Sequence, residues 1–380
     1  MEKRQIKFGE LKIGDIARKN LMECCDNNWI TMGEKTELFE KKWGELFDYP
    51  YNVAVSSGTD GVLNCCLALY EYGAKIGDEI ILPALSFIAT ANAVRAAGFT
   101  PVFCDIKKET LNIDETLIEE KITAKTVGII AVHTMGRPCE MDIISAISKK
   151  HGLILIEDSC ESHGARYKDK YVGHWGDMSC VSLFSAHILC AGEGSVISCH
   201  DEYLSMILKS TRNHGRSGEY FDFPRFGLNS KMNDLEASIA LEGIEYFWKN
   251  FHKREMNVHK LRSALDKFSD MVWFSEEDEG NMNCPHGFSI TLKENKDKRV
   301  PLVLRLTDVL DNAKIQWKRN FGCISTQHNA FKYLGHKLGD FPNAEHVGSN
   351  GIHVGVHQYL SSQDIDYMID HISFGLEKCR

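Results

Sequence analysis

The sequence predicts an α/β fold in which a mostly parallel sheet is covered by helices on both faces. Short apolar stretches alternate with helical patterns from residue 53 to about residue 200, as in chains built from β–α–β units. The run from Val127 to Val132 is apolar throughout, which is typical of a central strand buried on both faces. A length of 380 residues also favours two domains over one.

Composition narrows the class of protein. Hydrophobic residues make up 43% of the chain and charged residues 26%, so a large core is expected and disorder is not. A net charge of −9 argues against nucleic acid or an anionic membrane as the main partner. The sequence shows neither a signal peptide nor an apolar run of about 18 residues that would span a membrane. The 13 cysteines follow no pairing framework, which predicts free, mostly buried thiols in a reducing cytoplasm.

The first elements form a strand, a glycine turn and a helix. Residues 1–30 are polar with a helical pattern and are expected to form an arm over the body, and residues 37–47 have helical spacing. Val53–Val55 should be a short strand, followed by a turn that includes Gly58 and Thr59, and then by a helix. Such a turn brings amide N–H groups and the helix dipole to one point and can bind an anion, although it can also serve only to close a corner.

Polar residues follow the next predicted strands. Strands are expected at 77–83, 100–105, 127–132, 153–156 and 180–184, and a helix at 141–151. His133 and Asp158 come at two strand ends, and the segment from Ser182 to His187 follows a third. Because ligands of parallel sheets bind beyond the carboxyl ends of the strands, these side chains are expected to lie together.

The remainder of the chain is expected to form a second unit. A helix should run from Leu235 to about Arg262, and the composition shifts there towards a smaller α+β domain. We therefore expect a large domain with an N-terminal arm over residues 1–250 and a small C-terminal domain over residues 251–380.

A series of ordered motifs resembles one family. The motifs are Ser57-Gly58-Thr59, Gly77-Asp78-Glu79, Glu157-Asp158, His163-Gly164-Ala165, Gly192-Glu193-Gly194 and Arg212-Asn213-His214-Gly215. With this order and spacing the chain resembles the DegT/DnrJ-type sugar-nucleotide aminotransferases. The resemblance implies a fold-type-I, pyridoxal-phosphate-dependent aminotransferase fold, with residues 1–250 binding the cofactor. It also implies a homodimer with shared active sites.

The resemblance also implies roles for individual residues. Asp158 would pair with the ring nitrogen of the cofactor, and Phe87 would stack on the ring. Ser182, Gly58 and Thr59 would bind its phosphate, and Asn229 would reach the phosphate from the partner subunit. Each has a plain structural alternative: a helix cap for Asp158, a core ring for Phe87, a backbone contact for Ser182 and a loop position for Asn229.

Two departures from the aminotransferase pattern bear on the chemistry. His187 stands where the family has the lysine that holds pyridoxal phosphate as a Schiff base. Glu161, which the resemblance also places among the cofactor-binding residues, stands where most family aminotransferases have Gln. Both are features of one branch, the 3-dehydratases that make 3,6-dideoxysugars with non-covalently bound pyridoxamine phosphate. In such an enzyme a base must remove a proton from the methylene carbon of the cofactor. Imidazole suits this proton transfer because its pKa lies near neutrality and it forms no stable Schiff base. A related type needs an iron–sulfur cluster with a Cys-x-Cys pattern, which this sequence lacks.

The function implied is a pyridoxamine-phosphate-dependent dehydratase that removes the 3-hydroxyl of a nucleotide-linked 4-keto-6-deoxyhexose. L-Glutamate would restore the amine form of the cofactor, His187 would move the protons, and the product would feed surface-polysaccharide synthesis. One alternative is a sugar-nucleotide aminotransferase, natural or with an engineered Lys-to-His change. Another is a non-catalytic, B6-binding regulatory homologue.

Several further residues have less support. His214 and Arg216 are candidates for contact with the substrate, and Arg137 is a candidate for its phosphates. His133 and His163 are lesser candidates, because a lone histidine near a strand end is more often a structural group. Ser195 replaces the last glycine of the family's Gly-Glu-Gly-Gly turn and would be strained if that position required a positive φ.

Overall fold

The computed structural model describes residues 5–218, 221–293 and 301–380. Residues 1–4 of the expected arm, 219–220 of the loop after Arg216 and 294–300 of the expected small domain lie outside the described residues. The described part contains a seven-stranded sheet in which only β9 runs antiparallel to its neighbours. The expected mostly parallel sheet is thus confirmed. Its strands, in spatial order, are β1 (Tyr51–Val55), β9 (Ser195–Cys199), β8 (Met178–Ser182), β5 (Ile154–Asp158), β4 (Thr126–Val132), β2 (Glu79–Pro83) and β3 (Thr100–Cys104).

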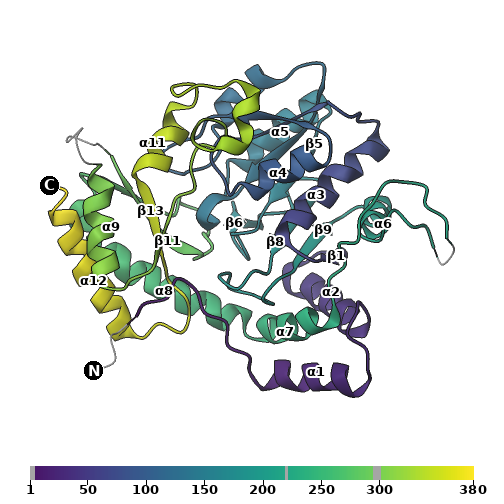
Figure 1. Cartoon of the computed structure of the whole chain (residues 1–380), viewed down its shortest axis with the longest axis horizontal. Helices are drawn as coiled ribbons and strands as arrows, with labels where there is room; N and C mark the ends of the chain where they lie inside the picture. Colours follow the sequence, from purple (N-terminus) through teal and green to yellow (C-terminus); the bar gives the residue numbers. More distant parts are fainter. Residues whose placement is uncertain (1–4, 219–220, 294–300) are drawn as a thin grey trace.

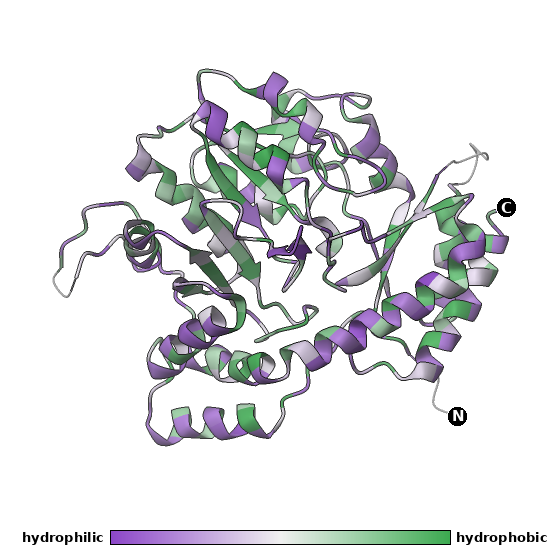
Figure 2. Ribbon diagram, turned by 180° about the vertical axis from the view of Figure 1, so that it is seen from behind, coloured by the Kyte–Doolittle hydropathy of each residue, from purple (hydrophilic) through white to green (hydrophobic). Residues whose placement is uncertain are grey.

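Helices cover both faces of this sheet because its strands are apolar on both faces (Figures 1 and 2). Val53 and Val55 pack on one side, and Ala54, between them, packs on the other. The first face is covered by α3 (Gly58–Ala68), α4 (Ala89–Ala96) and α6 (Glu202–Thr211). The second is covered by α2 (Glu34–Phe47), α5 (Met141–His151) and α7 (Asp234–Glu245).

A second, antiparallel sheet follows in the C-terminal part of the chain. Its order is β10 (Val272–Phe274), β11 (Gly287–Leu292), β13 (Gly351–Gly355) and β12 (Trp317–Arg319). The helices α9 (Leu302–Asn312) and α12 (Ser362–Glu377) share its apolar core. Shorter elements of the described chain are α10 (Ile324–Gln327), α11 (Pro342–Asn350), β6 (Arg166–Tyr167) and β7 (Lys170–Tyr171).

The helix α8 (Phe247–Leu265) joins the two sheets, and the expected boundary at residue 250 falls inside it. Its first turns pack into the core of the large sheet through Phe247 and Phe251. Its last turns pack under the second sheet through Leu261 and Leu265. The single long helix expected from Leu235 to Arg262 is two helices, because Tyr246 leaves the helical conformation at φ −105° and ψ 10°.

The N-terminal arm contacts both parts. Ile6 forms a bridge with Ile315, next to the second sheet, and the helix α1 (Asp15–Asp26) lies beside α7 (Figure 1). The Ala17 amide donates to the Glu242 carboxylate of α7 at 2.7 Å. No helix in the described ranges is both long and apolar enough to cross a bilayer.

Ser195 is not strained. It is the first residue of β9, in register with Val55 on one side and Ser182 on the other. The positive φ values of this turn belong to Gly192, at 94°, and Gly194, at 122°. A serine is therefore accommodated at the position where the family carries its last glycine.

A buried arginine holds the turn that follows β8. Arg254 of α8 is 1% exposed and donates to the carbonyl oxygens of Ala186, at 3.2 Å, and His187, at 2.9 Å. A third bond, to the Gln358 side chain, measures 2.7 Å. Burial lowers the Arg254 pKa to about 10, so the guanidinium stays charged at neutral pH. The backbone of His187 is thus fixed by a helix that spans both parts of the molecule.

Candidate active site

A cavity of about 420 Å³ lies where the large sheet, the second sheet and the N-terminal arm meet. It brings together most of the residues singled out from the sequence, which are Gly58, Thr59, Phe87, Asp158, Glu161, Ser182 and His187. His133 also borders it. The convergence of strand ends expected from the sequence is therefore present.

Asp158 is the last residue of β5 and is mostly buried. Thr90 Oγ1 donates to its Oδ2 at 2.7 Å, and the Cys160 amide donates to its Oδ1 at 3.3 Å. Its carboxylate borders the cavity rather than capping a following helix. A buried carboxylate in this place fits a protonated ring nitrogen as its ionic partner.

Gly58 and Ser182 lie against each other at another part of the cavity. A Cβ atom at Gly58 would lie 3.0 Å from Ser182 Cβ and 3.2 Å from Ser182 Oγ, so a side chain at Gly58 would crowd the hydroxyl. Gly58 and Thr59 form the first turn of α3, whose amide N–H groups have no partners within the helix. A helix start beside a hydroxyl fits a phosphate group. The residues present thus fit both the ring and the phosphate of the predicted cofactor.

His187 is buried between two other imidazoles. Its ring stacks on His163 with centroids 5.3 Å apart, and its Nδ1 lies 3.3 Å from Nδ1 of His286. Burial lowers the pKa of His187 well below its usual value, and the positive charges of Arg254 and Lys318 add to this effect. Burial likewise lowers the pKa of His163, to about 4. His187 is therefore neutral at neutral pH, which is the state a proton acceptor needs.

Glu161 borders the same cavity. Its Oε2 accepts a hydrogen bond from the Met135 amide at 2.7 Å, and its Oε1 lies 3.3 Å from Nε2 of His286. Burial raises the pKa of this carboxyl to about 7, against the opposing effects of the Met135 amide and Lys318. The carboxylate is thus poised near neutrality beside a histidine.

Sequence reasoning missed part of the cavity wall. His286 comes just before β11, Lys318 and Arg319 lie on β12, and Phe8 comes from the arm. The Lys318 ammonium lies 4.2 Å from the centre of the Phe8 ring. No motif marked these residues, and the adjacent cations Lys318 and Arg319 were the one available signal. Their positive charge suits an anionic ligand at this wall.

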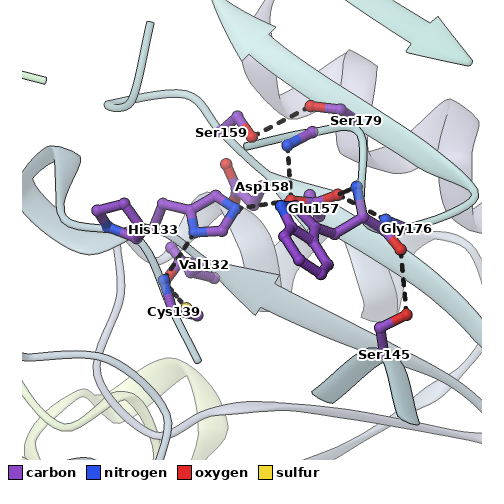
Figure 3. A network of polar contacts seen from close by, with 12 residues as sticks. Val132, His133, Cys139, Ser145, Glu157, Asp158, Ser159, Gly176 and Ser179 are labelled. Carbon is purple, nitrogen blue, oxygen red and sulfur yellow. Dashed lines mark hydrogen bonds and ion pairs between the residues drawn. The ribbon is translucent and has the colours of Figure 1, made fainter. Parts of the chain in front are cut away.

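His133 is structural although it borders the cavity (Figure 3). The Cys139 amide donates to its Nδ1 at 3.1 Å, so the ring proton is on Nε2, which lies 3.0 Å from Glu157 Oε2. Glu157 also accepts from the amides of Gly173, Trp175 and Gly176 at 2.6, 2.7 and 2.6 Å. Both ring nitrogens are therefore engaged in holding the fold.

Four candidates do not line this cavity. Asn229, His214 and Arg216 lie on the segment between α6 and α7, which extends away from the body (Figure 1). Arg216 lies over the ring of Phe221 at 4.8 Å. Arg137 is also engaged elsewhere, since its Nη2 lies 2.8 Å from both carboxylate oxygens of Asp278. Within the described ranges no group of three residues could hold a metal ion.

The raised pKa of Glu161 generates a prediction about stability. A carboxyl whose pKa rises from 4.5 to about 7 on folding contributes stability below pH 4.5 that is lost as the pH rises to about 7. Relative to Glu161→Gln, the cofactor-free wild type should therefore lose up to about 3 kcal/mol of unfolding free energy over this window. Urea unfolding of both proteins at a series of pH values measures the difference. Parallel stability curves would show that Glu161 titrates normally.

Comparison with known proteins covers almost the whole chain. The model of the DegT/DnrJ/EryC1/StrS aminotransferase family matches residues 12–373. GDP-4-keto-6-deoxy-D-mannose 3-dehydratase of Escherichia coli O55:H7 is 31% identical, over 93% of this chain and 96% of that protein. GDP-perosamine synthase of Escherichia coli O157:H7 is also 31% identical, over 92% and 93%.

Solved structures of similar proteins have the same fold over almost the whole chain. The E. coli GDP-4-keto-6-deoxy-D-mannose-3-dehydratase with bound hydrated PLP superposes with a TM-score of 0.87 at 28% identity, covering 97% of this chain and 100% of that one. A putative sugar aminotransferase from Streptococcus pneumoniae reaches 0.91 at 22% identity, covering 99% and 98%, and supports the fold alone. Pyridoxal or pyridoxamine phosphate, the predicted cofactor, is the cofactor of this family. The chain belongs to the DegT/DnrJ/EryC1/StrS aminotransferase family.

Proposed function

We propose that the protein is a pyridoxamine-phosphate-dependent 3-dehydratase acting on a nucleotide-linked 4-keto-6-deoxyhexose in deoxysugar synthesis. One observation carries this proposal: His187, a buried imidazole whose pKa is lowered by burial, lines the cavity. The sequence pattern gives it the place of the family's Schiff-base lysine. An imidazole can exchange protons there but cannot hold the cofactor covalently. The similarity to two proteins named as 3-dehydratases, at 31% and 30% identity, supports this reading.

The residues around the cavity have distinct tasks in this proposal. Asp158 would keep the ring nitrogen protonated, while Ser182 and the start of α3 would hold the phosphate. Pyridoxamine phosphate held by these residues would supply an amine for the keto group of the sugar and a ring able to accept electrons. Phe87, which is 62% exposed at the cavity edge, would cover the ring.

His187 would move one proton in two successive transfers. Its neutral ring can take a proton from the carbon beside the cofactor ring, and the resulting imidazolium can return it to the departing 3-hydroxyl oxygen. Because Arg254 fixes the backbone at residue 187, the imidazole is held in place without a covalent tie to the cofactor. Lys318 and Arg319 would face the anionic groups of L-glutamate or of the nucleotide.

We further propose a homodimer in which the segment between α6 and α7 completes the partner's cavity. Asn229, His214 and Arg216 lie outside the cavity of their own chain, and Phe221 and Phe226 on the same segment are 87% and 68% exposed. Apolar rings exposed on an extended loop favour burial against a second subunit. Asn229 would then reach the phosphate across the interface.

Product identity tests the proposed reaction. The protein loaded with pyridoxamine phosphate would receive L-glutamate and GDP- or dTDP-linked 4-keto-6-deoxyhexoses, the nucleotides named for dehydratase relatives. We expect by mass spectrometry a sugar lighter by one oxygen, with release of ammonia and 2-oxoglutarate. His187→Gln should bind the cofactor but turn over at least ~100-fold more slowly.

An amino sugar as the product would contradict dehydration and support the second candidate, amino transfer. That candidate is favoured by the equal similarity to GDP-perosamine synthase. Binding of either cofactor form without turnover of any of these nucleotides would instead favour a non-catalytic homologue.

Hybrid dimers test the shared site. A subunit with His187→Gln and a subunit with Asn229→Ala would be co-expressed with different tags and purified as the hybrid. If Asn229 acts across the interface, one of the two sites is intact, and the hybrid should have about half the wild-type activity although each parent is impaired. If Asn229 serves its own chain, neither site is intact and the hybrid stays as impaired as its parents.

A further inference from the structure

One side chain, His286, connects His187 and Glu161, two of the positions at which the sequence departs from the aminotransferase pattern. His286 Nδ1 lies 3.3 Å from Nδ1 of His187, and His286 Nε2 lies 3.3 Å from Oε1 of Glu161. All three side chains border the cavity, and His286 is 5% exposed. His286 comes from the segment before β11, whereas its two partners belong to the large sheet and its connections.

The donors and acceptors available in Glu161, His286 and His187 determine where the ring protons lie. Glu161, when ionised, can only accept, so the proton of a neutral His286 belongs on Nε2, the nitrogen that faces the carboxylate. His286 Nδ1 is then an acceptor, and the Nδ1–H of His187 donates to it. This leaves Nε2 of His187 unprotonated. Distances of 3.3 Å leave room for both contacts to tighten when ligands bind.

We propose that His286 is a positioning residue that transmits the charge of Glu161 to His187 and fixes the tautomer in which His187 Nε2 is the free base. The reaction that this base serves rests on the proposed function, but the arrangement of protons does not. When Nε2 takes a proton, the imidazolium keeps its Nδ1–H bond to His286. The carboxylate of Glu161 then offsets the positive charge through that ring.

Glu and Gln at position 161 would impose different tautomers on the two histidines. Oε2 accepts from the Met135 amide, so a Gln side chain would place its carbonyl oxygen there and turn its NH2 group towards His286. His286 Nε2 would then have to accept, and its proton would move to Nδ1. His187 Nδ1 would become the acceptor, and Nε2 would carry the proton. A Gln at position 161 therefore inverts both tautomers.

Nitrogen NMR of protein labelled isotopically in histidine tests this directly. Spectra would be taken of pyridoxamine-phosphate-loaded wild type and Glu161→Gln at roughly pH 8, where Glu161 is ionised. The His187 signals would be assigned by their loss in His187→Gln. We expect a bare Nε2 and a protonated Nδ1 in the wild type, and the reverse in Glu161→Gln. A protonated Nε2 in the wild type, or no change in the variant, would overturn the proposal.

Kinetics supply a second readout. Glu161→Gln should lower kcat by about 100-fold or more with little change in KM, since the base is in the wrong tautomer. In a His286→Leu background the same substitution should have little further effect, because Glu161 acts through His286. Multiplicative losses would contradict that. As a control, His357→Gln, at a buried histidine that does not border the cavity, should change neither the His187 signals nor kcat.

The two readouts separate this inference from the proposed function. If the tautomers of His187 and His286 invert in Glu161→Gln but no 3-deoxy sugar forms, the positioning role of His286 is supported and the proposed reaction is wrong. If the 3-deoxy sugar forms but the tautomers are the same in wild type and Glu161→Gln, the positioning role of His286 is wrong and the proposed reaction is supported.

Discussion

The site depends on one constraint: an imidazole is removed from water while remaining uncharged. His187 is 8% exposed, and Arg254 binds the backbone carbonyl of the same residue. A charged histidine in this environment would lack solvent and would face a buried guanidinium, so the neutral form is favoured. Burial keeps the His187 ring neutral, and a neutral ring can accept a proton. The packing that buries His187 therefore also sets its chemistry.

The strands and helices around His187 hold it in this buried position. The antiparallel β9 returns the chain directly after β8, so the turn that carries His187 is pinned between two paired strands. The helix α8 reaches that turn from the large core and continues beneath the second sheet. His286, Lys318 and Phe8 close the cavity from the second sheet and the arm. The cavity is therefore complete only when the arm and both sheets pack together.

Sequence reasoning succeeded where chemistry follows local pattern. The helix expected at 141–151 has those bounds in the structure, and the polar ends of three strands meet as expected. It failed where placement depends on long-range packing. His286 is 99 residues from His187 in sequence, and Arg254 is one of several basic residues on an amphipathic helix. Asn229, His214 and Arg216 do not line the cavity, and no local pattern in the sequence signals this.

We assign to His187 the proton transfer at the carbon beside the cofactor ring. This assignment is tested most directly with pyridoxamine phosphate deuterated at that carbon, incubated with 2-oxoglutarate and wild-type or His187→Gln protein. The mass of the re-isolated cofactor reports the label. We expect the wild type to release one deuterium to solvent and the variant to retain it. Equal loss of the label from both proteins would show that another group is the base and would contradict the assignment of His187.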